Sequence, residues 1–303
     1  MRHGQVCVNA QTPTNPAQFA ALSPLNHALP RTATPEDGAP FGAFTPQGLD
    51  RMLVAASRLT FLGHAEPRKL IWRVIRRRAQ PCFDVTVHGV RMRLHPFDSA
   101  VERVLLLRPQ KYCPGELAFL RQCLASGGTL IDAGANVGAM SLPFAQLTDV
   151  EIVAVEPVLT ALSRLRFNVA ANGFRNMRIE AAALSDKEGF AKFFVHGGNI
   201  GFSGVGEAWA AGHEIEVPTL TFAAVLRKHR IKSPYVLKID VERHEDVVLM
   251  PFLQSAPQDR WPRHILIETI GHQGVPACVG LMLAHGYERT FATRQNTGLS
   301  LTT

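Results

Sequence analysis

The sequence has few of the features that mark disulfide-bonded, zinc-binding or membrane-spanning proteins. Its five cysteines are scattered and show no CxxC spacing, so neither a disulfide framework nor a zinc site is indicated. No segment approaches the roughly 18 uninterrupted apolar residues of a spanning helix. Arg2 and His3 are not followed by the apolar run of a secretory signal. We therefore expect a cytoplasmic protein that requires no metal.

The composition is that of a globular chain with an excess of positive charge. Of the 303 residues, 46% are hydrophobic, which is enough for a sizeable core. The formal net charge of +7 favours anionic partners such as nucleic acid, acidic lipid or phosphorylated substrates. Nothing in the composition indicates an oligomeric state.

Three parts follow one another along the chain. Residues 1–45 are rich in Pro, Ala, Thr and Asn and are predicted to form a disordered arm. Residues 46–126 are predicted to hold accessory helices and a β-hairpin, because helical spacing is followed by strict alternation on either side of His88 and Gly89. Residues 127–303 are predicted to form the main domain.

Two helices are predicted at the start of the accessory part. The first begins at Gln47 and carries apolar residues at helical spacing, namely Leu49, Met52, Leu53, Ala56 and Leu59. The second, at residues 68–78, carries six Lys and Arg beside Trp72. A basic amphipathic segment of this kind can contact an anionic membrane or nucleic acid, and the simpler interpretation is a solvated helix face. Both interpretations stay open.

Beyond residue 127, short apolar runs alternate with helical patterns. The predicted strands are residues 129–132, 152–156, 177–181, 236–240 and 265–268. This alternation predicts an α/β fold with a mostly parallel sheet. A helical pattern lies between the first two strands. The next helix is expected to start near Pro157 and to stop at Asn172 and Gly173.

Acidic residues end four of these strands, at the edge where an open parallel sheet binds its ligand. They are Asp132, Glu156, Asp240 and Glu268. After Asp132 comes a turn with Gly134, Asn136 and Gly138, whose glycines allow backbone to approach a ligand closely. Glu156, at the end of the next strand, is placed to bind a ribose diol.

The turn also restricts the kind of cofactor. Its spacing differs from the dinucleotide GxGxxG pattern and no phosphate-binding Lys-Ser/Thr follows, so a pyrophosphate is not expected. An acidic turn suits a ligand with a cationic end, and S-adenosylmethionine carries both an ammonium and a sulfonium. Structural roles stay open as well, because Asp132 could cap backbone N–H groups of the loop and Glu156 could be the N-terminal acid of the next helix.

Several motifs keep the order of a known family. They are Asp132-Ala-Gly-Ala-Asn-Val-Gly, Val155-Glu156-Pro157, Phe167-Asn168 with Asn172, Ala183-Leu184-Ser185-Asp186 followed by Gly189, and Leu237-Lys238-Ile239-Asp240-Val241-Glu242. Together they resemble the FkbM family of S-adenosylmethionine-dependent methyltransferases over about residues 128–287. Two positions depart from its pattern: Arg243 stands where glycine is usual, and Thr221 where aspartate is usual.

The resemblance implies a class I, Rossmann-like methyltransferase fold, with a mostly parallel seven-stranded sheet and helices on both faces. It also implies O-methylation of a hydroxyl on a carbohydrate or small-molecule acceptor. The residues expected to bind the cofactor are Asp132, Gly134, Asn136, Gly138, Glu156, Ala183, Leu184, Ser185 and Asp240.

Methyl transfer from a sulfonium has a good leaving group, so the protein mainly aligns the acceptor and takes its proton. The candidate catalytic residues are Asp240, Lys238, Glu242 and His244, with an ion pair as the structural alternative for Lys238. The glycine-rich residues 196–204 either close over substrate or merely connect two elements. Further candidates to line a pocket are Trp209, His213, Arg294 and Asn296.

The sequence leaves two other functions open. The net charge suggests a nucleic-acid methyltransferase, but Asp240-Val-Glu-Arg lacks the Pro-Pro-aromatic motif of base N-methylation. The Pro81-Cys82 pair lies far from the position of a cytosine-methylating nucleophile. A nucleic-acid acceptor is therefore not expected. The third possibility is a non-catalytic module that binds a polyanion or membrane, with residues 68–78 as the contact.

Overall fold

The computed structural model describes residues 38–59, 65–78, 80–196, 203–205, 212–270 and 274–301. Residues 33–303 make up one folded unit, and residues 1–32 are a separate unit outside the described residues. In the described part of the chain, no helix is long and apolar enough to cross a membrane.

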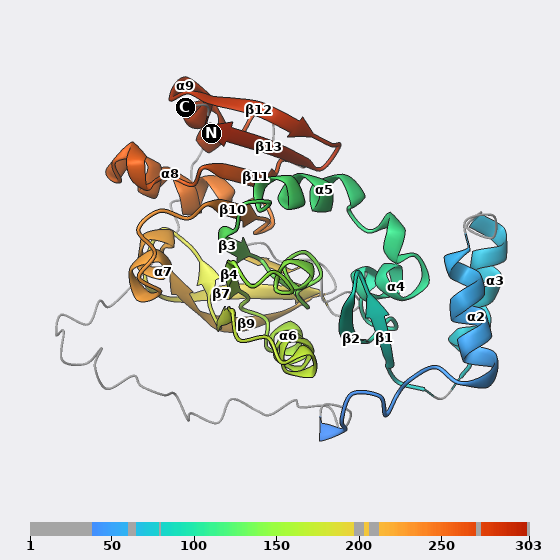
Figure 1. The fold of residues 1–303 in the computed structure, drawn as a ribbon. Coiled ribbons are helices and arrows are strands. Elements are labelled where there is room, and N and C mark those ends of the chain that lie inside the picture. The colour runs from blue at the N-terminus through green and yellow to red at the C-terminus, as the bar shows by residue number, and fades with distance from the viewer. Residues whose placement is uncertain are drawn as a thin grey trace, which may run out of the picture. The chain divides into compact units, whose positions relative to one another are not determined.

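A seven-stranded sheet forms the centre of the fold (Figure 1). Five strands are parallel: β3 (Gly128–Ala133), β4 (Val150–Val155), β5 (Met177–Glu180), β10 (Val236–Ile239) and β11 (His264–Glu268). At one side, β13 (Asn296–Leu301) runs antiparallel to β11, and β12 (Tyr287–Ala292) runs antiparallel to β13. The prediction of a mostly parallel, seven-stranded sheet is confirmed.

The strand order places the predicted site at the middle of this sheet. The order is β12-β13-β11-β10-β3-β4-β5. The first strand of this sheet along the sequence is β3. The next two, β4 and β5, are added on one side of β3, and β10 is then added on its other side. In open α/β sheets the ligand binds beyond the carboxyl ends of the strands where the order reverses. Here that point lies between β3 and β10.

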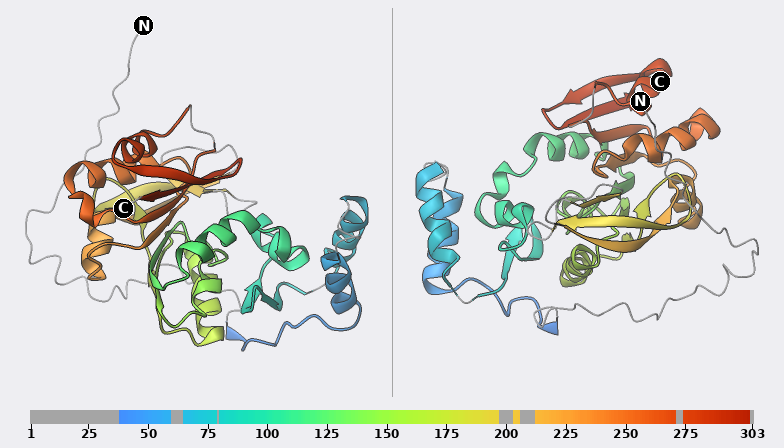
Figure 2. Two further views of the ribbon diagram at one scale, coloured as in Figure 1. Left: turned by 45° about the horizontal axis from the view of Figure 1, so that its top comes forward. Right: turned by 180° about the vertical axis from the view of Figure 1, so that it is seen from behind.

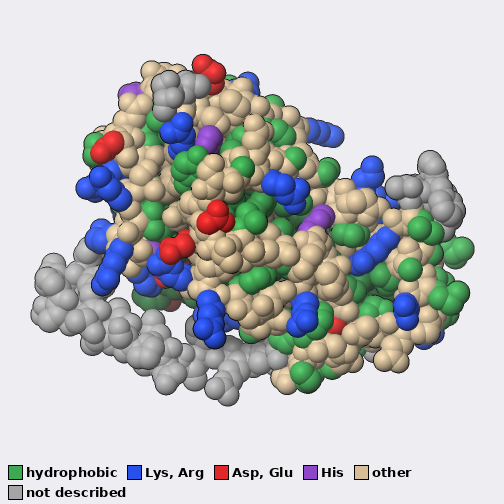
Figure 3. Space-filling model, viewed as in Figure 1, with side chains coloured by type: hydrophobic (Ala, Val, Ile, Leu, Met, Phe, Trp, Pro, Cys, Tyr) green, Lys and Arg blue, Asp and Glu red, His purple; other side chains and the backbone are tan. Residues whose placement is uncertain are grey.

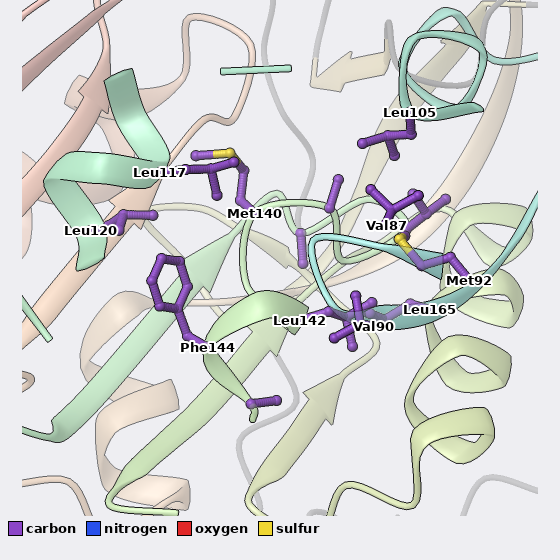
Figure 4. Close-up of a cluster of buried hydrophobic side chains, with 14 of the residues drawn as sticks. Val87, Val90, Met92, Leu105, Leu117, Leu120, Met140, Leu142, Phe144 and Leu165 are labelled. Atoms are coloured by element: carbon purple, nitrogen blue, oxygen red, sulfur yellow. The ribbon is translucent and has the colours of Figure 1, made fainter. Parts of the chain in front are cut away.

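Alternate side chains of the parallel strands enter two separate cores. Leu130, Ile152 and Val236 belong to a core that includes the N-terminal hairpin and α5 (Pro114–Cys123). Figure 4 shows part of it, with Leu117 and Leu120 of α5 near the loop that follows β3. The intervening residues, such as Ile131, Val153 and Leu237, pack against α7 (Phe222–Lys228), α8 (Glu245–Ser255) and α9 (Ala277–Ala284). Helices therefore cover both faces, as expected.

The predicted helix between the first two strands does not form. Only a short 3-10 helix, η4 (Leu142–Phe144), lies between β3 and β4, and Pro143 sits in its first turn. Proline has no N–H to donate to a continuing helix, so the segment remains short and buries Leu142 and Phe144 instead. The next helix is confirmed: α6 (Leu159–Asn172) ends at Gly173, whose φ of 67° is the left-handed conformation common after a helix.

The two accessory helices and the hairpin form as predicted, as α2 (Gly48–Arg58), α3 (Ala65–Ile75), β1 (Phe83–Val87) and β2 (Val90–Leu94). The basic residues 76–78, expected at the end of the second helix, follow α3. Two elements that the sequence did not predict, α4 (Ala100–Leu107) and η3 (Pro109–Lys111), come before α5. Residues 1–37 of the predicted arm lie outside the described residues, whereas the carbonyls of Ala39 and Pro40 accept hydrogen bonds from Arg93. The predicted domain limits at residues 45 and 126 stay predictions.

A second sheet, absent from the sequence prediction, follows the third strand. It contains β6 (Ala183–Leu184), β7 (Gly189–His196), β8 (Ser203–Val205) and β9 (Gly212–Leu220), in the order β6-β9-β7-β8. The prediction of a glycine-rich loop at residues 196–204 is therefore wrong at both ends, because residue 196 belongs to β7 and residues 203 and 204 belong to β8. Residues 197–202, Trp209 and the side chain of His213 lie outside the described residues.

Two asparagines of α6 bind the edge of the hairpin. The buried Asn168 accepts a hydrogen bond from the N–H of Arg93 (2.8 Å) and donates to the carbonyl of Val137 in the loop after β3 (3.2 Å). Asn172, one turn later, accepts from the N–H of Arg91 and donates to its carbonyl, both at 2.8 Å. The side chains of α6 therefore replace a neighbouring strand for β2 and connect it to the loop at the sheet centre.

We expect Asn168→Ala to lower the free energy of unfolding by about 1–3 kcal/mol, because it leaves a buried N–H and a buried carbonyl without partners. Asn172→Ala is the matched control, since its hydrogen bonds to Arg91 are exposed to solvent and water can replace them. Urea denaturation of both variants measures the difference. A loss at Asn168 no larger than at Asn172 would contradict this role.

Candidate active site

A cavity opens at the carboxyl ends of β3, β4 and β10, at the point where the strand order reverses. Its volume is about 1060 Å³, counted with its open mouth. Eight predicted site residues line it: Gly134, Asn136, Glu156, Ala183, Leu184, Lys238, Asp240 and Glu242. Four others, Asp132, Gly138, Ser185 and His244, lie outside the lining. The lining has three carboxyl groups and one cationic side chain, that of Lys238, so the cavity suits a cationic ligand.

The glycines of the turn are required by contacts within the protein. A Cβ on Gly134, whose φ is 76°, would lie 1.9 Å from the backbone oxygen of Asp240. One on Gly138 would lie 2.7 Å from side-chain atoms of Leu142 and Leu165. The glycines therefore let the loop after β3 pack against the end of β10 and against the core, and close approach to a ligand stays a prediction.

Glu156 holds the loop after β3 in place and also lines the cavity. One carboxyl oxygen accepts the N–H of Asn136 (2.8 Å) and the other accepts the N–H of Val158 (2.9 Å). Asn136 has a φ of 50°, a left-handed conformation that asparagine tolerates. Burial raises the pKa of Glu156 to about 7, against the opposing effect of these two hydrogen bonds. Glu156 therefore supports the loop after β3 and also lines the cavity.

Lys238 ties the two central strands together. Its ammonium donates to the carbonyl of Gly134 (2.8 Å) and lies 3.2 Å from an oxygen of Asp132 and 3.8 Å from one of Asp240. Burial lowers the pKa of Lys238, but the charges of Asp132 and Asp240 outweigh burial and raise it well above the usual range. The ammonium therefore stays protonated and cannot take a proton from a substrate.

Asp132 is fully buried beside this ammonium. No backbone N–H of the described residues donates to its carboxyl oxygens, so the expected capping of loop N–H groups is not observed. Its counterion is the Lys238 ammonium, 3.2 Å away. Because Asp132 is fully buried and lies outside the cavity lining, it supports the site through Lys238.

Three carboxyl groups gather where β10 and β11 end. Burial, together with the charges of Asp240 and Glu245, raises the pKa of Glu242 to about 7. Burial and the charges of Asp240 and Glu242 raise the pKa of Glu268 to about 9, and Glu268 shares a hydrogen bond with Asp240. At neutral pH Glu268 therefore keeps its proton. The sequence identified Glu268 as a strand-end acid but did not assign it to the site.

The two departures from the family pattern have local explanations. Glu242 and Arg243 have φ values of 57° and 68°, so the usual glycine at position 243 corresponds to a left-handed backbone that arginine adopts here with strain. Thr221 is the N-cap of α7, and its hydroxyl accepts the N–H of Ala224 at 3.0 Å. Threonine fills the capping role that aspartate would fill equally well.

His244 and Ser185 meet beside the cavity. The His244 Nε2 and the Ser185 Oγ are 3.3 Å apart, and the same hydroxyl contacts Asp186 at 3.2 Å. Burial lowers the pKa of His244, although the charge of Asp186 opposes the shift. Both residues connect the end of β6 to the start of α8.

Other residues complete the wall. Tyr112 and Cys113 precede α5, Phe193 lies on β7 and Asn296 begins β13. Asn296 was expected to line a pocket, whereas Arg294 is not part of this lining. Burial, with the nearby Cys113 and Asp240, raises the pKa of Tyr112 far above its usual range. Pro114 marks the start of α5 in the sequence, but no local signal places the two residues before it at the site.

In the part of the chain that the structure describes, no three His, Cys, Asp or Glu side chains are grouped so that they could hold a metal ion.

We expect Arg243→Gly to raise the free energy of unfolding by about 1 kcal/mol, because glycine adopts the left-handed backbone without the clash of a Cβ. The matched control is Arg227→Gly, within α7, where glycine lowers helix stability by about 1 kcal/mol. Thermal and urea denaturation compare the two. A loss of stability in both variants would show that contacts of the Arg243 side chain outweigh its strain.

The raised pKa of Glu268 predicts a dependence of stability on pH. A carboxyl group with a folded pKa near 9 and an ordinary value of 4.5 stabilises the native state fully below 4.5, and this contribution is lost as pH rises through 9. Glu268→Gln does not titrate, so its stability relative to wild type should grow between about pH 5 and pH 9. The exposed Glu151→Gln serves as control. A stability difference between Glu268→Gln and wild type that does not change with pH would show that Glu268 does not have a raised pKa.

Comparison with solved structures finds several distant methyltransferases. A precorrin-6y C5,15-methyltransferase from Geobacter metallireducens is 14% identical, with a TM-score of 0.38 over 62% of this chain and 85% of its own. M. jannaschii tRNA m1G37 methyltransferase is 12% identical, with a TM-score of 0.41 over 75% of this chain and 58% of its own. M. jannaschii TYW2, solved with AdoMet, is 10% identical, with a TM-score of 0.37 over 73% and 87%. These likenesses are too weak to bear on function.

No curated protein matches the sequence significantly. The family model described as the methyltransferase FkbM domain matches residues 132–287, slightly more than half of the chain, from Asp132 at the end of β3 to Tyr287 in β12. The matched range contains the cofactor turn, Glu156 and the carboxyl cluster of β10 and β11. The chain belongs to the FkbM methyltransferase family and is an S-adenosylmethionine-dependent methyltransferase.

Proposed function

We propose that the protein methylates a hydroxyl group of a carbohydrate or other polyhydroxylated small molecule, with Asp240 as the proton acceptor. The observation that carries this proposal is the carboxyl cluster of Asp240, Glu242 and Glu268 at the end of β10 and β11, directly beside the cofactor loop. A hydroxyl loses its proton as it attacks, so a carboxylate placed at the reacting end of the cavity is the group required.

The residues present fit the cofactor. The lining, with three carboxyl groups and one cationic side chain, suits a ligand that carries an ammonium and a sulfonium. Glu156, at the end of β4, is placed for the ribose, and the apolar Ala183 and Leu184 form a wall for the adenine ring. When bound, S-adenosylmethionine supplies an electrophilic methyl group with a neutral thioether as its leaving group.

Lys238 and Asp240, at the end of β10, have different roles. Lys238 remains charged and holds Gly134 and Asp132, which makes it a positioning residue. Asp240 lies 3.8 Å from that ammonium and is 41% exposed, so its carboxylate faces the opening. The proton retained by Glu268 lets the two carboxyl groups lie side by side without full repulsion. His244 lies outside the lining and is a weaker candidate than Asp240 or Glu242.

The wall of the cavity supports a polyhydroxylated acceptor. Tyr112 and Phe193 supply aromatic surface, and Asn296 and Glu242 supply hydrogen-bonding groups. Apolar walls with a few polar groups are typical of small-molecule sites. Nucleic acid is disfavoured as an acceptor, because its phosphates would meet a lining with three carboxyl groups and one base.

We expect Asp240→Asn to lower kcat by about 10²-fold to 10⁴-fold while S-adenosylmethionine still binds, since the amide cannot take the proton. Asp259→Asn, an exposed aspartate in η5 (Gln258–Arg260), is the matched control and should leave both properties unchanged. Calorimetry measures cofactor binding, and transfer of a labelled methyl group to a panel of sugars and hydroxylated metabolites measures turnover. Wild-type turnover in the Asp240 variant would remove this residue from the mechanism.

A further inference from the structure

The positive charge of the chain is concentrated in its accessory part. Residues 48–111 hold 13 Lys and Arg against 5 Asp and Glu, a net charge of +8. The whole chain carries +7, so the remainder is close to neutral. The segment comprises α2, α3, the hairpin, α4 and η3. An attraction for anions therefore belongs to this part and not to the methyltransferase sheet.

A small pocket between α3 and α4 collects part of this charge. Its volume is about 390 Å³, and it is lined by Arg68, Lys69, Trp72, Arg103, Val104, Leu107 and Arg108. Four of these seven residues are basic and none is acidic. Such a lining fits one phosphate group or a similarly compact anion.

The cations of this pocket are held close together. Burial and the neighbouring charge of Arg68 lower the pKa of Arg108, and the Nε of Arg108 is buried without a hydrogen-bond partner in the described residues. The guanidinium of Arg103 lies 5.3 Å from the ring centroid of Trp72, which itself stacks on Phe97. The aromatic pair fixes Arg103 in the pocket wall. Like charges held together in this way are relieved by a bound anion.

Apolar side chains are exposed on the same two helices. Leu49, Met52 and Leu59 of the α2 region are 46%, 68% and 48% exposed, and Leu70 of α3 is 60% exposed. The apolar residues of the first predicted helix thus include several that face solvent. Figure 3 shows exposed hydrophobic and basic side chains together over α2 and α3. These helices lie side by side at one end of the folded unit, far from α8 and α9 (Figures 1 and 2).

We propose that α2, α3 and the α3–α4 pocket bind the surface of an anionic phospholipid membrane. The pocket takes the phosphate of a lipid headgroup, the other basic residues of α3 lie against the charged surface, and Leu49, Met52, Leu59 and Leu70 enter the interface. Basic and apolar side chains on adjacent short helices are the combination by which interfacial helices bind.

The same residues fit nucleic acid less well. The phosphates of a nucleic acid would be attracted by the positive charge, but they make no favourable contact with the exposed apolar side chains of Met52 or Leu70. Binding of single strands also uses aromatic side chains that are available to stack on bases. Trp72 is already stacked on Phe97 and covered by Arg103. Exposed apolar side chains therefore distinguish the two partners.

Co-sedimentation of the full-length protein with vesicles tests the membrane site. The vesicles are phosphatidylcholine alone, or phosphatidylcholine with about one third phosphatidylserine. We expect binding to the anionic vesicles only. Arg103→Gln with Arg108→Gln should weaken it about tenfold or more, given the attraction that each basic side chain adds near a charged surface. Met52→Ser with Leu70→Ser should weaken it as well.

Arg175→Gln with Arg260→Gln is the matched control, because it removes the same charge from exposed positions outside α2, α3 and α4. An equal loss in this control would overturn the pocket as the site. RNA binding tighter than vesicle binding, and unchanged by Met52→Ser with Leu70→Ser, would overturn the membrane in favour of nucleic acid. Thermal denaturation verifies that each variant is folded. Because vesicle binding needs neither cofactor nor acceptor, its outcome is independent of the proposed methyl transfer.

Discussion

The buried ammonium of Lys238 is the interaction on which the site depends. It lies among Asp132, Asp240 and the carbonyl of Gly134, and so joins the end of β3 to the end of β10. Without a cation there, the buried carboxylate of Asp132 would have no counterion, which is costly. The same ammonium holds the turn whose next residues reach Glu156 through the N–H of Asn136. The Lys238 ammonium therefore contributes both to the shape of the cavity and to the balance of its charges.

Much of the central architecture was predictable because its signals are local. Short apolar runs, four of them ending in an acid, located the five parallel strands, and Asn172 with Gly173 located the end of α6. The failures involve interactions between distant segments. The segment after Gly138, expected to be helical, forms only the short η4 at Pro143, and the second sheet depends on pairing between β7 and β9, which are separated in the sequence. Tyr112 reaches the cavity only because α5 packs beside β11.

The candidate site itself was predicted in part. Eight expected residues line the cavity, and some of these, together with other residues of the same motifs, also hold the surrounding protein in place. Asp132 and Lys238 form a buried pair, Gly134 accommodates the backbone of Asp240, and Ser185 contacts His244. A sequence motif contains both kinds of residue, because residues that line the cavity and residues that support it lie in the same loop. Only the structure shows which side chains line the cavity and which contact the surrounding protein.

The asparagines of α6 also affect how the hairpin behaves toward other chains. A two-stranded hairpin is marginal alone, and a bare edge strand is a template for pairing with a second molecule. On one side of this hairpin, Asn168 and Asn172 bind the N–H groups of Arg93 and Arg91. On the other side, the N–H of Asp84 donates to the carbonyl of Phe44. Both flanks are engaged by the chain itself, which opposes strand exchange and fibrous aggregation through this part of the protein.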